Sequence, residues 1–330
     1  MRRTRMICLG IECTAHTFGI GIIKDKKILA NIKDSYITEQ GGIIPIDAAK
    51  HHEAVKNEVL EKALEKANLE LKDVDVFSFS NAPGLAPCLL TGMAFAKKLA
   101  AENKKPLIPV NHCCAHLEIG KLLTKAKDPV LLYASGANTQ IMAFEGGKYR
   151  IFGETLDQGI GNFLDAFARY IGLGFPGGPK IYELSLKAKN FVELPYVVKG
   201  MDVSFSGILS NLKQKYDSKE YSVEDLSFSA QETTFAMLIE VSERAMAHCN
   251  KNELLLGGGV GCNIRLQEMG RKMCESRNAK SFAPENQFLV DNGAMIANLG
   301  LLMAKAGYKK DSKRIDIQPY QRTDDIEVIW

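Results

Sequence analysis

The chain has 330 residues, of which 46% are hydrophobic and 25% are charged, so it can bury a sizeable core in one or two globular domains. Its formal net charge of +3 is only mildly basic and neither demands nor excludes nucleic acid, so any RNA surface must be a local patch. Basic residues recur in short runs, which are typical of solvated faces and also of phosphate-binding patches, at 2–5, 97–98, 104–105 and 309–310.

The cysteines and the apolar runs bear on where the protein resides. The eight cysteines include no CxxC pair, which argues against a zinc ribbon or a redox motif. The basic start is not followed by the apolar run and cleavage site of a signal peptide, and no apolar stretch reaches the roughly 18 residues that span a bilayer. We therefore expect a reduced, cytoplasmic protein with free thiols and no membrane association.

The first part of the chain predicts strands that alternate with helices. Short apolar runs bounded by turn residues predict strands, and apolar positions at helical spacing predict helices. The expected strands are 6–12, 17–24, 27–31, 74–80 and 107–110, and the expected helices are 47–69, 89–103 and the segment that follows residue 110.

The same pattern then restarts. Strands are expected at 129–134, 139–145 and 253–256, and helices around 162–171, 207–215, 223–250, from 263 to 275 and from 291 to 306. A strand, a hairpin and a turn followed by helices and strands thus occur twice. We interpret this as two α/β lobes, 1–128 and 129–330, with a central nucleotide cleft.

The pair His112 and His116 is the most informative local feature. Four residues apart, the two side chains fall on one face of a helix, where they can bind one transition metal or pack as interior histidines. Cys113 and Cys114 lie between them, but adjacent helical side chains point about 100° apart, so both cannot face a metal with the histidines. We expect the cysteines to be packing residues.

Three loops have the composition of phosphate or nucleotide sites: 10–15, 135–139 and 257–263. Tight turns expose backbone N–H groups to an anion, and the glycines of the last loop allow close approach of a nucleoside, with Asn263 as a hydrogen-bonding candidate. Each loop alone is also an ordinary turn; no GxxxxGK(S/T) P-loop occurs, and the loop 257–263 is not GxGxxG. Three loops in this order suggest the actin/Hsp-type/sugar-kinase (ASKHA) superfold.

Three further side chains have two interpretations each. Asp165 lies within an apolar helical face and needs a partner, either a ribose hydroxyl or Arg169. Asp291, before the last helix, is either a bare N-cap or a metal ligand. Tyr133, at the end of a strand, is either plain core or part of a site.

Together these motifs resemble the TsaD family of tRNA N6-adenosine threonylcarbamoyltransferases, in the archaeal and eukaryotic branch that acts within the KEOPS complex. The resemblance covers nearly the whole chain. It rests on the segments 10–16, 81–85, 111–116, 133–140, 153–165, 175–179, 201–207 and 291–294.

The resemblance implies a site. The implied ligands of one transition metal ion per subunit, Fe²⁺ in preference to Zn²⁺, are His112, His116, Tyr133 and Asp291. The implied adenine-nucleotide positions are Tyr133, Ala134, Ser135, Gly136, Ala137, Asp165, Gly178 and Asn263.

Some positions depart from the family pattern. Tyr182, with Glu183 beside it, stands where the family usually has an acidic ribose contact. The family's Gln-Gly-Pro-Gly stretch reads Asn81-Ala82-Pro83-Gly84 in this chain. Ala137 replaces the second glycine of the SGGNT turn, which a turn with φ < 0 at that residue tolerates.

The implied reaction transfers the threonylcarbamoyl group from threonylcarbamoyl-AMP to N6 of the anticodon-adjacent adenosine of tRNA and releases AMP. The metal orients and polarises the intermediate, and Glu12 is our candidate general base. The implied partners are tRNA, a small atypical protein kinase and small accessory subunits. The alternatives are an ASKHA-type ATPase or sugar kinase, a non-catalytic subunit of the same complex, and a metallopeptidase, although Cys113 occupies the place of the HExxH glutamate.

Overall fold

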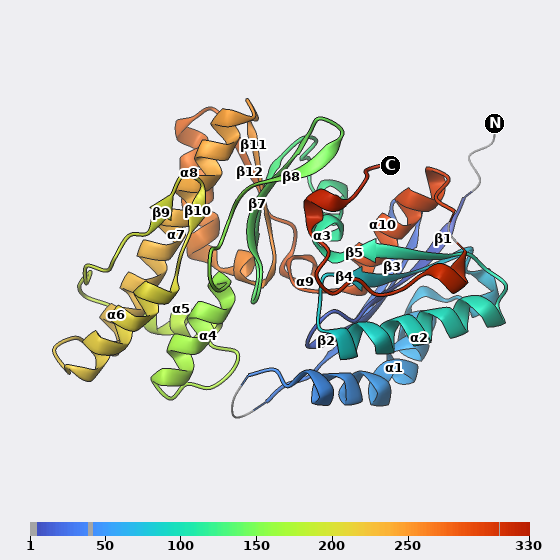
Figure 1. Cartoon of the computed structure of the whole chain (residues 1–330), viewed down its shortest axis with the longest axis horizontal. Coiled ribbons are helices and arrows are strands. Elements are labelled where there is room, and N and C mark those ends of the chain that lie inside the picture. Colours follow the sequence, from blue (N-terminus) through green and yellow to red (C-terminus); the bar gives the residue numbers. More distant parts are fainter. Residues whose placement is uncertain (1–4, 39–41, 310) are drawn as a thin grey trace. The chain divides into compact units, whose positions relative to one another are not determined.

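The structure, a computed structural model, describes residues 5–38, 42–309 and 311–330. The chain divides into two compact units, which Figure 1 draws with their elements labelled. The first unit comprises Met1–Ile37, Ile43–Leu123 and Asp291–Trp330, and the second comprises Thr38–Gly42 and Thr124–Val290. This division differs from the expected 1–128 and 129–330, because the last long helix packs on the first sheet and takes the C-terminal segment with it.

The first unit has a five-stranded sheet within its described residues, in the order β3-β2-β1-β4-β5. Strands β1, β2 and β3 are antiparallel, whereas β4 and β5 continue the sheet parallel to β1. The strands are β1 (Ile7–Glu12), β2 (Thr17–Lys24), β3 (Lys27–Ser35), β4 (Val76–Ala82) and β5 (Leu107–Asn111). The helices are α1 (Pro45–Ala67), α2 (Ala86–Glu102), α3 (His112–Leu123) and α10 (Gly293–Lys305), with short 3₁₀ turns at Leu71–Asp73, Ser312–Arg314 and Thr323–Asp325.

Backbone-to-backbone packing fixes α10 against this sheet. A Cβ on Gly10 would lie 2.1 Å from the Ala297 nitrogen, and one on Gly21 would lie 2.1 Å from the Ala294 nitrogen. Only glycine fits at such distances, because a side chain would occupy the space of the neighbouring backbone. Gly10, expected in a phosphate loop, therefore serves packing, and α10 and the residues just before it are held against β1 and β2.

The second unit repeats the arrangement of the first. Its described five-stranded sheet has the order β12-β11-β6-β7-β8, with β6, β7 and β8 antiparallel and β11 and β12 parallel to β6. The strands are β6 (Val130–Ala134), β7 (Thr139–Glu145), β8 (Lys148–Glu154), β11 (Glu253–Gly257) and β12 (Lys280–Phe282), with a small ribbon of β9 (Val198–Lys199) and β10 (Asp202–Val203). The repeated pattern expected from the sequence and the α/β class are confirmed.

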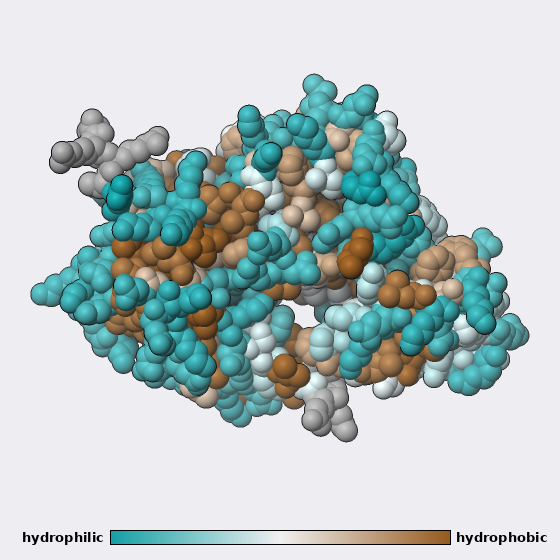
Figure 2. Space-filling model, turned by 180° about the vertical axis from the view of Figure 1, so that it is seen from behind, coloured by the Kyte–Doolittle hydropathy of each residue, from teal (hydrophilic) through white to brown (hydrophobic). Residues whose placement is uncertain are grey.

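The helices of the second unit supply most of its core. They are α4 (Ile160–Tyr170), α5 (Gly178–Ser185), α6 (Ser206–Asp217), α7 (Val223–His248), α8 (Ile264–Ser276) and α9 (Asn286–Leu289), with a 3₁₀ turn at Gly259–Cys262. Each unit buries a hydrophobic cluster of its own, as independent folding units do. On the face drawn in Figure 2 hydrophilic residues are interspersed with hydrophobic ones, which is ordinary for a globular surface. No helix in the described part of the chain is long and apolar enough to cross a membrane.

The C-terminal segment that follows α10 is tied to the first unit by hydrogen bonds. The backbone N–H of Gln318 donates to the carbonyl of Asn81, and the Trp330 indole donates to the Glu118 carboxylate on α3 at 3.0 Å. The Lys97 ammonium donates to the Ile315 carbonyl at 2.7 Å. Lys97, one of the basic residues considered for an RNA patch, thus helps to hold this segment.

Candidate metal centre and nucleotide-binding loops

The two histidines lie at the start of α3, which follows β5 without a loop. The Asn111 carboxamide oxygen accepts from the N–H groups of Cys113 and Cys114, and this caps the first turn of the helix. His112 and His116 are both buried, and their ring centroids are 4.8 Å apart. Both side chains therefore lie on one face, as the four-residue spacing predicts.

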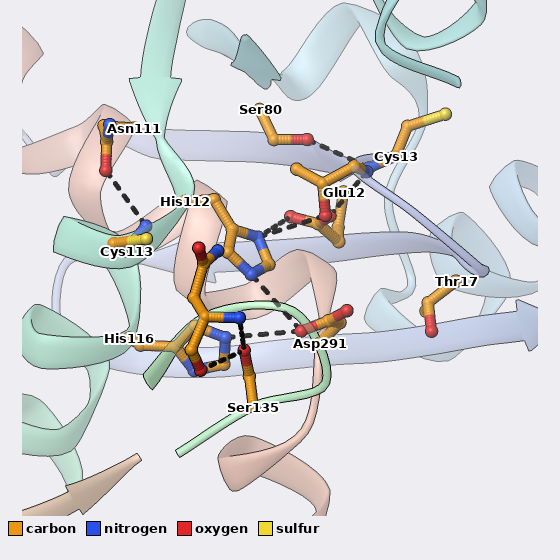
Figure 3. A network of polar contacts seen from close by, with 12 residues as sticks. Glu12, Cys13, Thr17, Ser80, Asn111, His112, Cys113, His116, Ser135 and Asp291 are labelled. Atoms are coloured by element: carbon orange, nitrogen blue, oxygen red, sulfur yellow. Dashed lines mark hydrogen bonds and ion pairs between the residues drawn. The ribbon is translucent and has the colours of Figure 1, made fainter. Parts of the chain in front are cut away.

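Asp291 meets both rings. Its Oδ1 lies 3.3 Å from Nε2 of His112 and 3.4 Å from Nε2 of His116, and Figure 3 shows the two rings turned toward this one carboxylate. Burial alone would raise the pKa of the Asp291 carboxyl, but the adjacent histidines outweigh that effect and hold the pKa well below its usual value. An ionised carboxylate and two imidazole nitrogens converge on one point.

Of the two interpretations of Asp291, the N-cap of the last helix is wrong. The N-cap of α10 is Asn292, whose side-chain oxygen accepts from the Met295 N–H at 3.0 Å. Since the cap is one residue later, the Asp291 carboxylate is not used by the helix. It is nevertheless held firmly, because α10 itself is locked on the sheet by the glycine contacts.

The residues present fit a transition metal. The ligand atoms of His112, His116 and Asp291 lie within 4.8 Å of one another, and they form the one such group of His, Cys, Asp or Glu found among the described residues. Burial lowers the pKa of His116, which favours the neutral ring that binds metals. Two imidazoles and a carboxylate suit iron or zinc. Burial raises the pKa of the thiols of Cys113 and Cys114, as for packing residues.

Glu12 contacts the other side of His112. Its Oε2 lies 2.9 Å from His112 Nδ1, while its Oε1 accepts from the N–H of Thr14 at 2.8 Å and from the Thr14 hydroxyl. Glu12 is fully buried. A carboxylate on the second nitrogen of a metal-binding histidine fixes the tautomer and the orientation of the ring. These contacts favour an orienting role for Glu12 over the general base that the sequence suggested.

The turn between β6 and β7 rests on the start of α4. Ser135 closes the turn through its hydroxyl, which donates to the Asn138 carbonyl at 2.9 Å. The first amides of α4 donate into the same region: Ile160 to the Thr139 hydroxyl, Gly161 to the Ser135 carbonyl and Asn162 to the Gly136 carbonyl. The backbone φ of Ala137 is not positive, as expected for an alanine that replaces glycine there.

The loop after β11 approaches the end of β6. Gly258 has φ +84°, and a Cβ on it would lie 2.3 Å from the Ala134 carbonyl oxygen, so glycine is required. Asn263 caps α8, because its side-chain oxygen accepts from the N–H groups of Arg265 and Leu266. Its amide nitrogen donates to the Gln231 side chain at 2.6 Å. The capping role and the Gln231 contact were not apparent from the sequence.

The two remaining nucleotide candidates on helices, Asp165 and Gly178, are linked through Gly177, the residue before Gly178. The Asp165 carboxylate accepts from the N–H of Gly177 at 2.7 Å, directly before Gly178 begins α5. One partner of Asp165 is thus a backbone amide. Tyr133 is buried at the end of β6, in the second unit, where it pairs with Gln140 of β7. Its role as a metal ligand stays a prediction.

Comparison with known proteins decides the family. The family model described as TsaD, tRNA N6-adenosine threonylcarbamoyltransferase, matches residues 27–298. The chain belongs to this family. A relative from Thermococcus sibiricus named tRNA N6-adenosine threonylcarbamoyltransferase is 53% identical over 98% of this chain and 100% of its own length. A Xenopus laevis relative of the same name is 48% identical over 98% of this chain and 99% of its own length.

Another relative of the family is a longer protein. The chain is 49% identical to a Methanosarcina acetivorans protein named probable bifunctional tRNA threonylcarbamoyladenosine biosynthesis protein, covering 98% of this chain but 59% of that protein.

Solved structures at low identity establish the fold. HypF from T. kodakarensis has a TM-score of 0.65 at 14% identity, covering 90% of this chain and 47% of that one. Component A of the Acidaminococcus fermentans (R)-2-hydroxyglutaryl-CoA dehydratase has a TM-score of 0.56 at 14% identity, covering 91% of this chain and 99% of that one. The chain thus has the two-lobed α/β fold of the ASKHA type that the sequence predicted.

Proposed function

We propose that this chain transfers a threonylcarbamoyl group from threonylcarbamoyl-AMP to N6 of the anticodon-adjacent adenosine of tRNA. Membership of the threonylcarbamoyltransferase family supports a tRNA-modifying transferase. The observation that carries the finer proposal is the convergence of His112 and His116 on Asp291, a site that a transferase acting by Lewis-acid assistance needs.

In the proposed reaction the adenosine N6 forms a bond to the carbonyl carbon of the mixed anhydride. The bond from that carbon to the phosphate oxygen breaks, its electron pair leaves with AMP, and N6 loses one proton to the departing phosphate or to the solvent. Because the substrate is already activated, the protein needs no covalent nucleophile. Its contribution is to position the two reactants and to stabilise charge on the carbonyl and phosphate oxygens.

His112, His116 and Asp291 would hold one ion, Fe²⁺ or Zn²⁺, with Tyr133 proposed as a further oxygen ligand. When bound, such an ion supplies Lewis acidity toward the oxygens of the intermediate. Glu12 contacts Nδ1 of His112, so that Nε2 of the same ring faces Asp291. Since both Glu12 oxygens are engaged, the side chain acts by orientation rather than by taking the N6 proton.

The proposed adenylate positions are Tyr133 to Ala137, Asp165, Gly178 and Asn263. Contacts within the second unit support the grouping. The 135–138 turn docks on the start of α4, Gly258 reaches the carbonyl of Ala134, and Asp165 holds the start of α5. Tight turns that gather in this way can present backbone N–H groups to a phosphate.

We also propose that the chain works with KEOPS-type partners, including a small atypical protein kinase and small accessory subunits. The longer Methanosarcina relative is named as a bifunctional protein, which supports a second activity that operates beside this one. tRNA is the proposed nucleic-acid partner.

Mass spectrometry of tRNA nucleosides tests the function. Unmodified tRNA would be incubated with this chain, partner subunits, ATP, threonine, bicarbonate and an enzyme that forms the adenylate. We expect threonylcarbamoyladenosine with the wild type, its loss in the double variant His112→Ala/His116→Ala, and its retention in His248→Ala, an exposed histidine at the end of α7. A double variant as active as the wild type would overturn the metal role. Adenine-nucleotide and metal binding without product would favour an ATPase or a non-catalytic subunit.

A further inference from the structure

A second pair of histidines, His51 and His52 on α1, lies outside the site described so far. Their Nδ1 atoms are 3.2 Å apart. His51 Nε2 lies 2.8 Å from the Asp34 carboxylate on β3, and His52 Nε2 lies 2.8 Å from the Ala15 carbonyl oxygen, in the turn between β1 and β2. The two rings therefore connect a half-exposed carboxylate with the turn that follows Glu12.

The partners fix the direction of each hydrogen bond. A carbonyl oxygen only accepts, so His52 Nε2 carries a proton, and an ionised carboxylate only accepts, so His51 Nε2 carries one too. Between the two Nδ1 atoms one must donate and the other accept. His52 is fully buried, and burial lowers its pKa, so its ring is the neutral acceptor. His51 then donates from both ring nitrogens, which makes it a cation in an ion pair with the Asp34 carboxylate.

The turn that receives this chain of bonds, residues 13–16, is held at successive carbonyls from different elements. Leu85 N–H donates to Thr14, the His52 ring to Ala15 and Tyr36 N–H to His16, each at 2.8 Å. On its other side the turn places the N–H and the hydroxyl of Thr14 on Glu12, and Glu12 orients His112. A continuous chain of hydrogen bonds thus connects the 13–16 turn, through Thr14 and Glu12, to His112 of the candidate metal centre.

We propose that His51 and His52 are positioning residues for the metal centre. The relay from Asp34 through both rings to Ala15 holds the 13–16 turn, so that Thr14 and Glu12 keep His112 in its ligating orientation. The effect on the turn is independent of the reaction, whereas the effect on catalysis rests on the proposed function.

Amide hydrogen exchange of residues 13–17 tests the effect on the turn. Loss of one neutral hydrogen bond should speed exchange there by about fivefold to tenfold. We expect faster exchange in His52→Leu, which removes the donor to Ala15. We expect it also in His51→Phe, which keeps a ring at the less buried position and serves as the test if His52→Leu fails to fold. His52→Gln retains an N–H donor and should restore slow exchange. His248→Gln is the control, because the His248 ring packs on Phe152 in the second unit, which does not contain the 13–16 turn.

The link to the site is measured separately, by calorimetric titration with Zn²⁺. We expect His52→Leu and His51→Phe to bind Zn²⁺ about tenfold more weakly, with His52→Gln close to wild type. Unchanged exchange in both disrupting variants, or a Gln variant as labile as the Leu variant, would overturn the relay. Faster exchange with unchanged Zn²⁺ affinity would overturn its connection to the metal centre. A wild-type chain that lacks transferase activity would overturn the proposed function, and the exchange experiment would still decide the relay.

Discussion

Nδ1 of His112 lies 2.9 Å from Oε2 of Glu12, while Nε2 of the same ring lies 3.3 Å from Oδ1 of Asp291. The ring is therefore held between a fully buried carboxylate, which sets its tautomer, and a second carboxylate, which shares the candidate metal position. This arrangement supports the proposed role of His112 as a metal ligand, because a carboxylate on the second nitrogen is what orients such a ring.

Replacing Glu12 by Gln should weaken metal binding. The amide keeps the size of the side chain but loses the charge that stabilises the Nδ1–H tautomer of His112, so we expect a decrease in Zn²⁺ affinity of about 10- to 100-fold. Competition with a chromophoric chelator measures it. The control is Glu58→Gln, on the exposed face of α1. A variant that retains full Zn²⁺ affinity but loses the transfer step would instead support the general-base role.

The adjacent residues Asp291 and Asn292 should separate metal binding from helix capping. Asp291→Asn removes an ionised ligand, so it should abolish tight metal binding, and it leaves the cap of α10 in place. Asn292→Ala removes that cap and should lower the free energy of unfolding by about 1 kcal/mol. Metal content by mass spectrometry and chemical denaturation measure the two effects. A destabilised Asp291→Asn variant with full metal content would contradict this separation.

Close packing of α10 should make Gly21 intolerant of alanine. The added Cβ would lie 2.1 Å from the Ala294 nitrogen, and backbone on both sides has to move, so we expect Gly21→Ala to cost about 3 kcal/mol or more. Gly207→Ala, a helical position with open space around the added atom, is the matched control and should leave stability unchanged or slightly raised. Urea denaturation gives both values. Equal stability of the two variants would refute the packing argument.

Asp157 should make the second unit sensitive to acid. Its carboxylate accepts from the N–H groups of Phe205 and Ser206 and from the Ser204 hydroxyl, at the start of α6. Burial alone would raise the pKa of this carboxyl, but these hydrogen bonds outweigh burial and hold the pKa well below its usual value.

The sign of the pH effect follows from that lowered pKa. The stabilisation is present above the unfolded-state pKa of about 3.9 and is lost as the pH falls below it, toward the folded-state pKa. Asp157→Asn should therefore cost about 1 kcal/mol at pH 6, a value reduced for its exposure to solvent, and progressively less below pH 4. Thermal unfolding of both proteins between pH 3 and pH 6 measures the difference, and a constant difference over this range would contradict the assignment.

Local patterns determined much of this protein from the sequence. The helical spacing of His112 and His116 placed both rings on one face, the alternation of apolar runs gave the repeated α/β order, and motif resemblance gave the family. The short strand β12 was missed, because its three residues carry too little periodicity to read. The strand β8 was also missed.

Only the tertiary structure decided which distant residues meet. The segment after residue 290 joins the first unit because glycines in β1 and β2 admit the backbone of α10, and that packing brings Asp291 to the histidines. Glu12 meets His112 because β1 and β5 end at the same edge of one sheet. Periodicity reports only the face on which a side chain lies, whereas its partner across the fold is fixed by packing between segments remote in the chain.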